Sequence, residues 1–391
     1  MTELYKSLVK FVRELYHTDG FIPLHVPTFD GNEAQYVRKT IDSTFVSSVG
    51  EYVDHFERLI AEYTGAAGAV ATVNGTAALH AALHLAGVVR DELVITQPLT
   101  FVATANAVRY CGADPVFLDV DEDTMGLSPT AVEAFFKSQC RSEPDGTVRH
   151  LATGRRVAAC VPMHTYGFPM RVQELIALCS SWGIPVVEDA AESLGSYLND
   201  THSGRFGIAG ILSFNGNKTI TTGGGGMIIT DDEKLAGHAK HLTTTAKVSH
   251  RWEHVHDELG FNYRLPNLNA ALGCAQMEQL SGKLAGKRSV AEAYIEFFGR
   301  AAWRAAGYRI ITERPGTQAN YWLNALVCPD RQSRDAVLAY TNDAGVMTRP
   351  AWQLMYRLPP YESCLNADCP AAEDLAERLV NLPSSPTAVV N

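Results

Sequence analysis

Short apolar runs alternate with helical patterns between residues 69 and 230, and this alternation constrains the fold more than any other feature. Seven of the runs have the length of a strand: Ala69–Val73, Leu93–Thr96, Val116–Val120, Val157–Pro162, Ile184–Glu188, Ile211–Phe214 and Met227–Thr230. Between most of them lie segments with helical spacing: Ala77–Ala86, Val102–Cys111, Thr130–Ser138 and Gln173–Ser181. The alternation predicts a mainly parallel sheet with helices on both faces. The ligand of such a sheet lies at the C-terminal ends of its strands.

Helical patterns flank this region on both sides. Before it, helices are predicted over Leu4–Tyr16, from Asp30 through Ile41, where Glu33 completes a capping-box pattern, and over Glu51–Tyr63. After it come long helical stretches and short strand-like pieces: Leu268–Leu280, Lys287–Arg304, Tyr308–Ile311, Trp322–Val327 and Ser333–Ala344. We therefore expect an N-terminal segment plus a large domain over residues 1–250, and a smaller C-terminal α+β domain over residues 251–391. The polar stretch Arg141–Arg156 is expected to be an exposed loop.

Composition excludes several classes of protein. Apolar residues make up 46% of the 391 residues, too many for a mainly disordered chain, and the net charge is −10. No cluster of Lys and Arg offers a nucleic-acid surface, and no apolar run is long enough to cross a bilayer. The eight cysteines are scattered without a Cys-x-x-Cys pair, so we expect reduced thiols and no metal site. These features predict a cytoplasmic protein without nucleic-acid or membrane partners.

Lys218 lies in an unusual stretch that runs from Gly210 to Gly226. An apolar run ends in polar residues, presents this single lysine, and passes through four consecutive glycines into a second apolar run. A partly desolvated amine loses its proton more readily, which suits Schiff-base chemistry. A surface lysine beside a flexible turn is the simpler interpretation, and other parts of the chain must decide between the two.

Two further segments place polar residues at the ends of predicted strands. In the first, Gly75 and Thr76 open a helix, whose free amides attract a phosphate, although Asn and Thr are also ordinary helix caps. In the second, Glu188 and Asp189 end an apolar strand, where a carboxylate is costly without a partner. Metal binding and a structural salt bridge would also explain that acidic pair.

Pyridoxal phosphate accounts for these segments together. A lysine can bond to its aldehyde carbon, and an aspartate can hold its ring nitrogen protonated so that the ring accepts electrons. Lys218 and Asp189 supply those two groups, and Ser213 lies five residues before Lys218. Phe101, which opens a helix, could stack on the ring, although an isolated aromatic residue is more often part of the core. The dinucleotide-binding, P-loop and nucleophile-elbow motifs do not occur.

The sequence resembles the pyridoxal-phosphate-dependent nucleotide-sugar aminotransferases known as the DegT/StrS family. The resemblance covers roughly residues 20 to 385 and rests on these segments: 74–79 (Asn-Gly-Thr-Ala-Ala-Leu), 100–106 (Thr-Phe-Val-Ala-Thr-Ala-Asn), 188–191 (Glu-Asp-Ala-Ala), 213–218 (Ser-Phe to Lys), 225–227 (Gly-Gly-Met) and 260–264 (Gly-Phe-Asn-Tyr-Arg). Residues 215–217 and 42–50 are similar to the branch that aminates C4 of 4-keto-6-deoxy-N-acetylhexosamine nucleotides, in the bacillosamine and legionaminic acid pathways.

The resemblance implies fold-type-I architecture: a mostly parallel seven-stranded sheet flanked by helices, a smaller C-terminal α+β domain, and a homodimer with active sites at its interface. It implies a role for each matching residue. Gly75, Thr76 and Ser213 would hold the cofactor phosphate, Asp189 its ring nitrogen and Lys218 its aldehyde carbon. Asn262 would reach the phosphate of the partner's cofactor. Glu192 stands where many members have Gln or His near the phenolic oxygen, and residues 348–352 lack a histidine found in many members.

The implied activity is a ping-pong transamination. L-Glutamate would leave as 2-oxoglutarate, and the amino group would pass to C4 of a nucleotide-linked 4-keto-6-deoxy-N-acetylhexosamine. Amination at C3 is the nearest alternative, and a non-catalytic regulator that retains the fold is another. Related sugar dehydratases carry histidine in place of the lysine, so Lys218 speaks against their chemistry. The set formed by Lys218, Asp189 and Ser213 speaks against a regulator, which has no need for all three.

Overall fold

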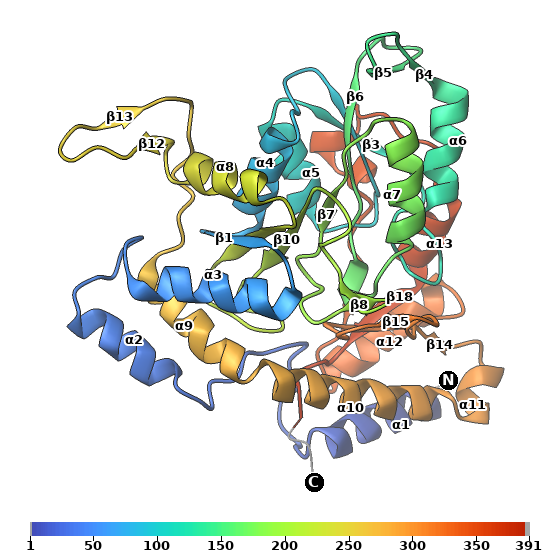
Figure 1. The fold of residues 1–391 in the computed structure, drawn as a ribbon. Coiled ribbons are helices and arrows are strands. Elements are labelled where there is room, and N and C mark those ends of the chain that lie inside the picture. The colour runs from blue at the N-terminus through green and yellow to red at the C-terminus, as the bar shows by residue number, and fades with distance from the viewer. Residues whose placement is uncertain (1, 388–391) are drawn as a thin grey trace.

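A seven-stranded sheet forms the centre of the larger part of the molecule in the computed structural model, which describes residues 2–387 (Figure 1). Its strands, in spatial order, are β1 (Gly68–Thr72), β11 (Gly226–Thr230), β10 (Ala209–Ser213), β7 (Val187–Asp189), β6 (Val157–Val161), β2 (Leu93–Thr96) and β3 (Asp114–Phe117). Parallel bridges from Cys160 to Val186 and from Met163 to Asp189 join its two halves. Only β11 runs against the other strands. The predicted mostly parallel seven-stranded sheet is confirmed.

Helices cover both faces of this sheet because its strands are apolar on both sides. On one face lie α4 (Gly75–Leu85), α5 (Val102–Tyr110) and α8 (Glu233–Thr243). On the other lie α6 (Pro129–Gln139), α7 (Val172–Ser181), α3 (Glu51–Thr64) and α9 (Asn267–Glu278). Successive residues of β2 face opposite ways: Leu93 and Ile95 pack on one side, and Val94 packs on the other. Such double burial explains why the strands read as continuous apolar runs.

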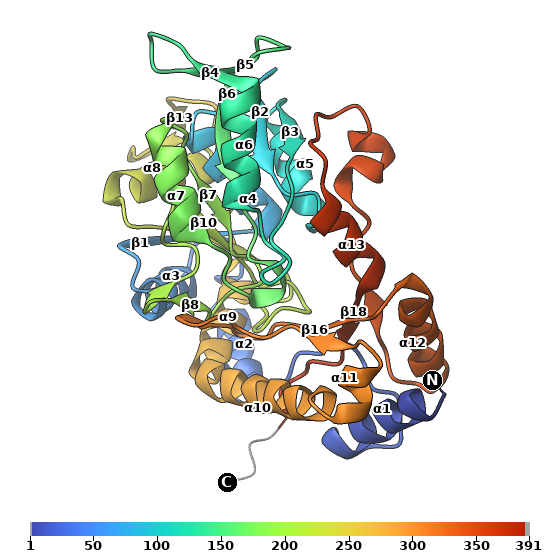
Figure 2. The same cartoon turned by 90° about the vertical axis from the view of Figure 1, so that its right-hand side faces the viewer.

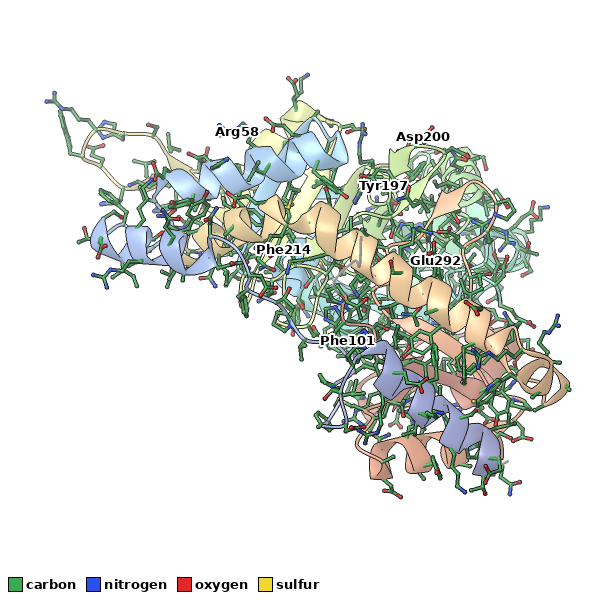
Figure 3. The ribbon with its side chains drawn as sticks, turned by 90° about the horizontal axis from the view of Figure 1, so that it is seen from below. Arg58, Phe101, Tyr197, Asp200, Phe214 and Glu292 are labelled. Carbon is green, nitrogen blue, oxygen red and sulfur yellow. The ribbon has the colours of Figure 1, made fainter. Side chains whose placement is uncertain are left out.

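A second, antiparallel sheet organises the C-terminal part (Figure 2). Its strands are β14 (Arg309–Ile310), β16 (Asn324–Val327), β18 (Leu379–Leu382) and β17 (Arg349–Pro350). Its helices are α10 (Leu280–Phe298), α11 (Ala301–Ala305), α12 (Arg331–Asp343) and α13 (Pro370–Arg378). Helix α1 (Thr2–Leu15) packs here as well, and Figure 3 shows it beside α10 on the underside of the molecule. The domain boundary near residue 250 stays a proposal. Helix α1, although it begins the chain, packs against the C-terminal part.

Short elements complete the chain. Strands β8 (Tyr197–Leu198), β9 (Thr201–His202) and β15 (Thr317–Gln318) form a small sheet, and β12 (Lys247–Val248) pairs with β13 (Val255–His256) in a hairpin that extends away from the body (Figure 1). The 3₁₀ turns are η1 (Thr165–Gly167), η2 (Met355–Arg357) and η3 (Pro359–Tyr361). Within residues 2–387, no helix is both long and apolar enough to span a bilayer.

Two local predictions were wrong. The stretch expected to be an exposed loop contains a hairpin of β4 (Cys140–Ser142) and β5 (Val148–His150), whose turn is held by Asp145 accepting from the amide and hydroxyl of Thr147. Helix α2 (Glu33–Asp42) begins after Asn32 and not at Asp30. Its Glu33 carboxylate accepts from the Gly31 amide, so the expected capping box does not form.

Candidate active site

A cavity of about 350 Å³ lies at the C-terminal ends of the central strands. Seven of the eight residues singled out in the sequence line it: Gly75, Thr76, Phe101, Asp189, Glu192, Ser213 and Lys218. Trp322 and Trp352 from the C-terminal part close its other side. The cavity therefore collects side chains from both parts of the molecule.

Lys218 extends into this cavity from a turn that follows β10. Its amide donates to the carbonyl of Asn215 at 3.0 Å, which closes the turn. Its Nζ donates to Glu192 Oε1 at 3.1 Å and lies 4.0 Å from the centroid of the Trp322 ring. The side chain is only 12% exposed. The interpretation as a free surface lysine is therefore wrong, because this amine is held inside a cavity.

Glu192 is buried beside that amine. Its Oε2 accepts from the backbone amide of Tyr166 at 2.9 Å, while Oε1 faces Lys218. Burial raises the pKa of the Glu192 carboxyl to about 7, and the nearby Lys218 charge and the Tyr166 amide oppose that rise. A carboxyl group with a pKa near neutrality can exchange a proton with its neighbours at working pH.

The two acids at the end of β7 have different environments, because successive side chains of a strand point to opposite faces. Asp189 lines the cavity: its Oδ2 accepts from Thr104 Oγ1 at 2.7 Å, and its Oδ1 accepts from the Ala191 amide at 3.2 Å. Glu188 is fully buried away from the cavity. It accepts four hydrogen bonds, from His164 Nε2 and from the amides of Gly204, Phe206 and Gly207. Glu188 is therefore a structural carboxylate, and Asp189 is the one available to a ligand.

The N-terminus of α4 also lines the cavity. Asn74 caps the helix by accepting from the Ala77 amide at 2.8 Å, and Gly75 and Thr76 follow in the first turn. Amides in a first helical turn have no acceptor within the helix. A Cβ atom added to Gly75 would lie 3.1 Å from Cβ of Ser213, so the glycine keeps this corner open beside the Ser213 hydroxyl. The corner offers amides and hydroxyls to an anion.

The sequence analysis gave no role to Thr104, Trp322 or Trp352. Thr104 lies in the 100–106 segment that carries the family resemblance, whereas the two tryptophans reach the cavity through tertiary packing and carry no local signal. Phe101, which was expected to contact the cofactor ring, lines the cavity with 49% of its surface exposed and lies 6.4 Å from the Trp352 ring, centroid to centroid.

Asn262 lies outside the cavity of its own chain. It is exposed on the surface, forms a bridge with Thr244, and accepts from the guanidinium of Arg264 through Oδ1. Asn262 therefore does not belong to the cavity lining that contains Lys218 in the same chain.

The groups around the cavity fit pyridoxal phosphate. The open corner at Gly75 and Ser213 suits its phosphate, the Asp189 carboxylate suits a protonated ring nitrogen, and the Lys218 amine suits its aldehyde. No group of three or more His, Cys, Asp or Glu side chains within residues 2–387 could hold a metal ion. The fold and the site together define a pyridoxal-phosphate-dependent enzyme of fold type I.

The chain belongs to the DegT/DnrJ/EryC1/StrS aminotransferase family, whose sequence pattern matches residues 27–389. It is 33% identical over 367 residues to GDP-perosamine synthase of Escherichia coli O157:H7, covering 94% of both chains. It is 35% identical over 367 residues to EpsN of Bacillus subtilis (strain 168), described as a pyridoxal phosphate-dependent aminotransferase, covering 93% of this chain and 90% of EpsN. The crystal structure of the aminotransferase TlmJ from Streptoalloteichus hindustanus is similar, with a TM-score of 0.83, 27% identity and 94% of each chain covered. The chain is a sugar aminotransferase that uses pyridoxal phosphate, as the resemblance implied.

Proposed function

We propose that this enzyme transfers the amino group of L-glutamate to C4 of a nucleotide-linked 4-keto-6-deoxyhexose. The observation that carries the proposal is the Lys218 amine, held by Glu192 in the same cavity as Asp189. The similarity to GDP-perosamine synthases supports the position of attack, since perosamine is a 4-amino-4,6-dideoxyhexose. We expect the enzyme to act in the cytoplasm, because its proposed substrates, nucleotide sugars and glutamate, occur there.

Five residues of the cavity have a defined role in this proposal. Bound pyridoxal phosphate supplies an electron sink for the bonds at the amino-bearing carbon. Lys218 would take the proton from the donor's α-carbon and, in the second half of the reaction, would deliver a proton to C4 of the sugar. Asp189 keeps the ring nitrogen protonated. Gly75, Thr76 and Ser213 hold the phosphate through amides and hydroxyls.

The two candidate acceptor sugars differ in the substituent at C2. Residues 215–217 and 42–50 resemble enzymes acting on N-acetylhexosamines of the bacillosamine and legionaminic acid pathways, whereas perosamine carries a hydroxyl at C2. We propose the C2 acetamido sugar as the acceptor, and the GDP-linked 2-hydroxy sugar is the second candidate. The first rests on particular motifs and the second on similarity along the whole chain.

A panel of nucleotide sugars tests this proposal. We expect ¹⁵N-labelled glutamate to give a product with ¹⁵N on C4, detected by NMR, from one 4-keto-6-deoxy sugar of the panel. The kcat/KM for that sugar should exceed the others at least about tenfold, because a site built for a polar substituent rejects analogues that leave its groups unpaired. The panel includes UDP- and GDP-linked 4-keto sugars with acetamido or hydroxyl at C2, and one 3-keto sugar. Label at C3 would select the C3 alternative, and no label from any sugar of the panel would contradict the proposed class of acceptor.

We also propose that the enzyme is a homodimer in which Asn262 serves the partner's cofactor phosphate. Asn262 is exposed and does not line the cavity of its own chain, and both observations support this arrangement. A turn residue that bonds only its neighbours, such as Arg264, is the simpler interpretation.

Mixing two inactive variants distinguishes these interpretations. If the Lys218→Ala and Asn262→Ala homodimers are both severely impaired, subunit exchange should restore about a quarter of the parent activity. Half of the dimers are then heterodimers, and each has one site with both residues intact. The measurement is turnover after exchange, with heterodimers verified by mass spectrometry. If Asn262 serves its own chain, no site in the heterodimer is complete, and verified heterodimers stay inactive.

A further inference from the structure

We propose that Trp322 is a positioning residue for the reactive lysine. It fixes the turn that carries Lys218, and it holds the Lys218 amine whenever that amine is not bonded to the cofactor. This inference rests on the proposed role of Lys218 and extends it to a residue of the C-terminal part.

One indole makes both contacts. Its Nε1–H donates to the backbone carbonyl of Asn217 at 2.7 Å, directly before Lys218, so it constrains the backbone from which the lysine extends. Its ring face lies 4.0 Å from the Lys218 Nζ, within the range in which an ammonium is attracted to an aromatic face. The amine therefore has the Glu192 carboxylate as one neighbour and the Trp322 ring as another.

Trp322 is itself held firmly on its backbone. Its amide donates to Asn320 Oδ1 at 2.8 Å, and the Asn320 side chain in turn donates to the backbone carbonyl of Glu192 at 2.8 Å. Its carbonyl accepts from Lys287 Nζ at 3.1 Å. Lys287 is buried and also donates to the carbonyls of Tyr321 and Ser384. Only 5% of Trp322 is exposed, so the indole is a rigid support for the turn.

This support has a chemical consequence. When it is not bonded to the cofactor, the Lys218 amine would have to reach the donor's α-carbon to take its proton. An amine whose resting position varies spends less time in the geometry that permits proton transfer. Because Trp322 lies two residues before β16, packing of the C-terminal part against the sheet sets that resting position.

Trp352 provides a matched control. It lines the same cavity, but within residues 2–387 its ring contacts are with Phe101 and Tyr166, and the ring that faces the Lys218 amine is that of Trp322. Replacing either tryptophan by phenylalanine makes the same change of side chain at the cavity wall. Only Trp322→Phe removes the hydrogen bond to Asn217.

The test compares Trp322→Phe with Trp352→Phe in the fully loaded enzyme. Stopped-flow absorbance follows the half-reaction with glutamate and with α-deuterated glutamate. For Trp322→Phe we expect pyridoxamine phosphate affinity within twofold of the parent, a half-reaction slowed roughly tenfold, and a larger deuterium isotope effect, because proton transfer becomes more limiting. For Trp352→Phe we expect the parent isotope effect.

Three results would overturn the proposal. The first is a parent-like rate and isotope effect in Trp322→Phe, and the second is the same raised isotope effect in Trp352→Phe. The third is loss of pyridoxamine phosphate binding by Trp322→Phe, because that loss would indicate a general packing role for Trp322. A Lys218→Ala control separates this failure from failure of the proposed function. Parent-like Trp322→Phe kinetics beside an inactive Lys218→Ala reject the role of Trp322 alone. A Lys218→Ala enzyme that still reacts with glutamate rejects the role of Lys218 as well.

Discussion

Lys218→Ala lowers turnover by on the order of 10⁴-fold or more, because it removes both the group that bonds to the cofactor and the base that moves the proton. Binding of pyridoxamine phosphate should stay close to that of the parent. That form needs no bond to lysine, and the corner at Gly75, Thr76 and Ser213 and the Asp189 carboxylate remain. The measurements are steady-state turnover and a fluorescence titration with pyridoxamine phosphate. Normal turnover in this variant would place the reactive lysine elsewhere.

Asp189→Asn is expected to keep the cofactor and to lose most activity. A neutral amide no longer favours the protonated ring nitrogen, and removing an adjacent carboxylate typically lowers such a pKa by about 2 units. Each pKa unit corresponds to about 1.4 kcal/mol, so kcat should fall roughly 10²-fold. The measurement is kcat at equal cofactor loading, judged from the absorbance of the lysine-bound cofactor.

Glu188→Gln is the matched control for this variant. Glu188 is the adjacent carboxylate, but all its hydrogen bonds are structural, including those from His164 and the Gly204 amide. Its replacement should lower the free energy of unfolding by about 1–3 kcal/mol while changing kcat much less. Parent-like turnover by Asp189→Asn would make Asp189 another structural carboxylate.

The sequence predicted the central sheet well because double burial leaves a strong signal. All seven apolar runs became strands, and each boundary shifted by at most a few residues, as when Ile184–Glu188 became Val187–Asp189. The hairpin of β4 and β5 left no such signal, since its strands are short and partly polar. The start of α2 was misplaced because the capping-box pattern does not specify which amide the Glu33 carboxylate accepts from.

Some residues of the site were predictable from the sequence and others were not, for similar physical reasons. Gly75, Asp189 and Ser213 were predictable because strand ends and helix starts bring them to one edge of the sheet. Successive side chains of a strand lie on opposite faces, so only one of Glu188 and Asp189 can face the ligand. The sequence does not show which one, because it leaves the register of the strand open. Trp322 was not predictable, because more than 100 residues separate it from Lys218 and only packing of the C-terminal part joins them.

Borohydride reduction of the loaded enzyme, followed by peptide mapping, tests the central claim most directly. Lys287 is the competitor within the chain, because complete burial lowers the pKa of its amine to about 7, yet that amine donates to three backbone carbonyls. We predict one phosphopyridoxyl group per chain, on the peptide that contains Lys218. A label on the peptide of Lys287, or on any other lysine, would contradict the account.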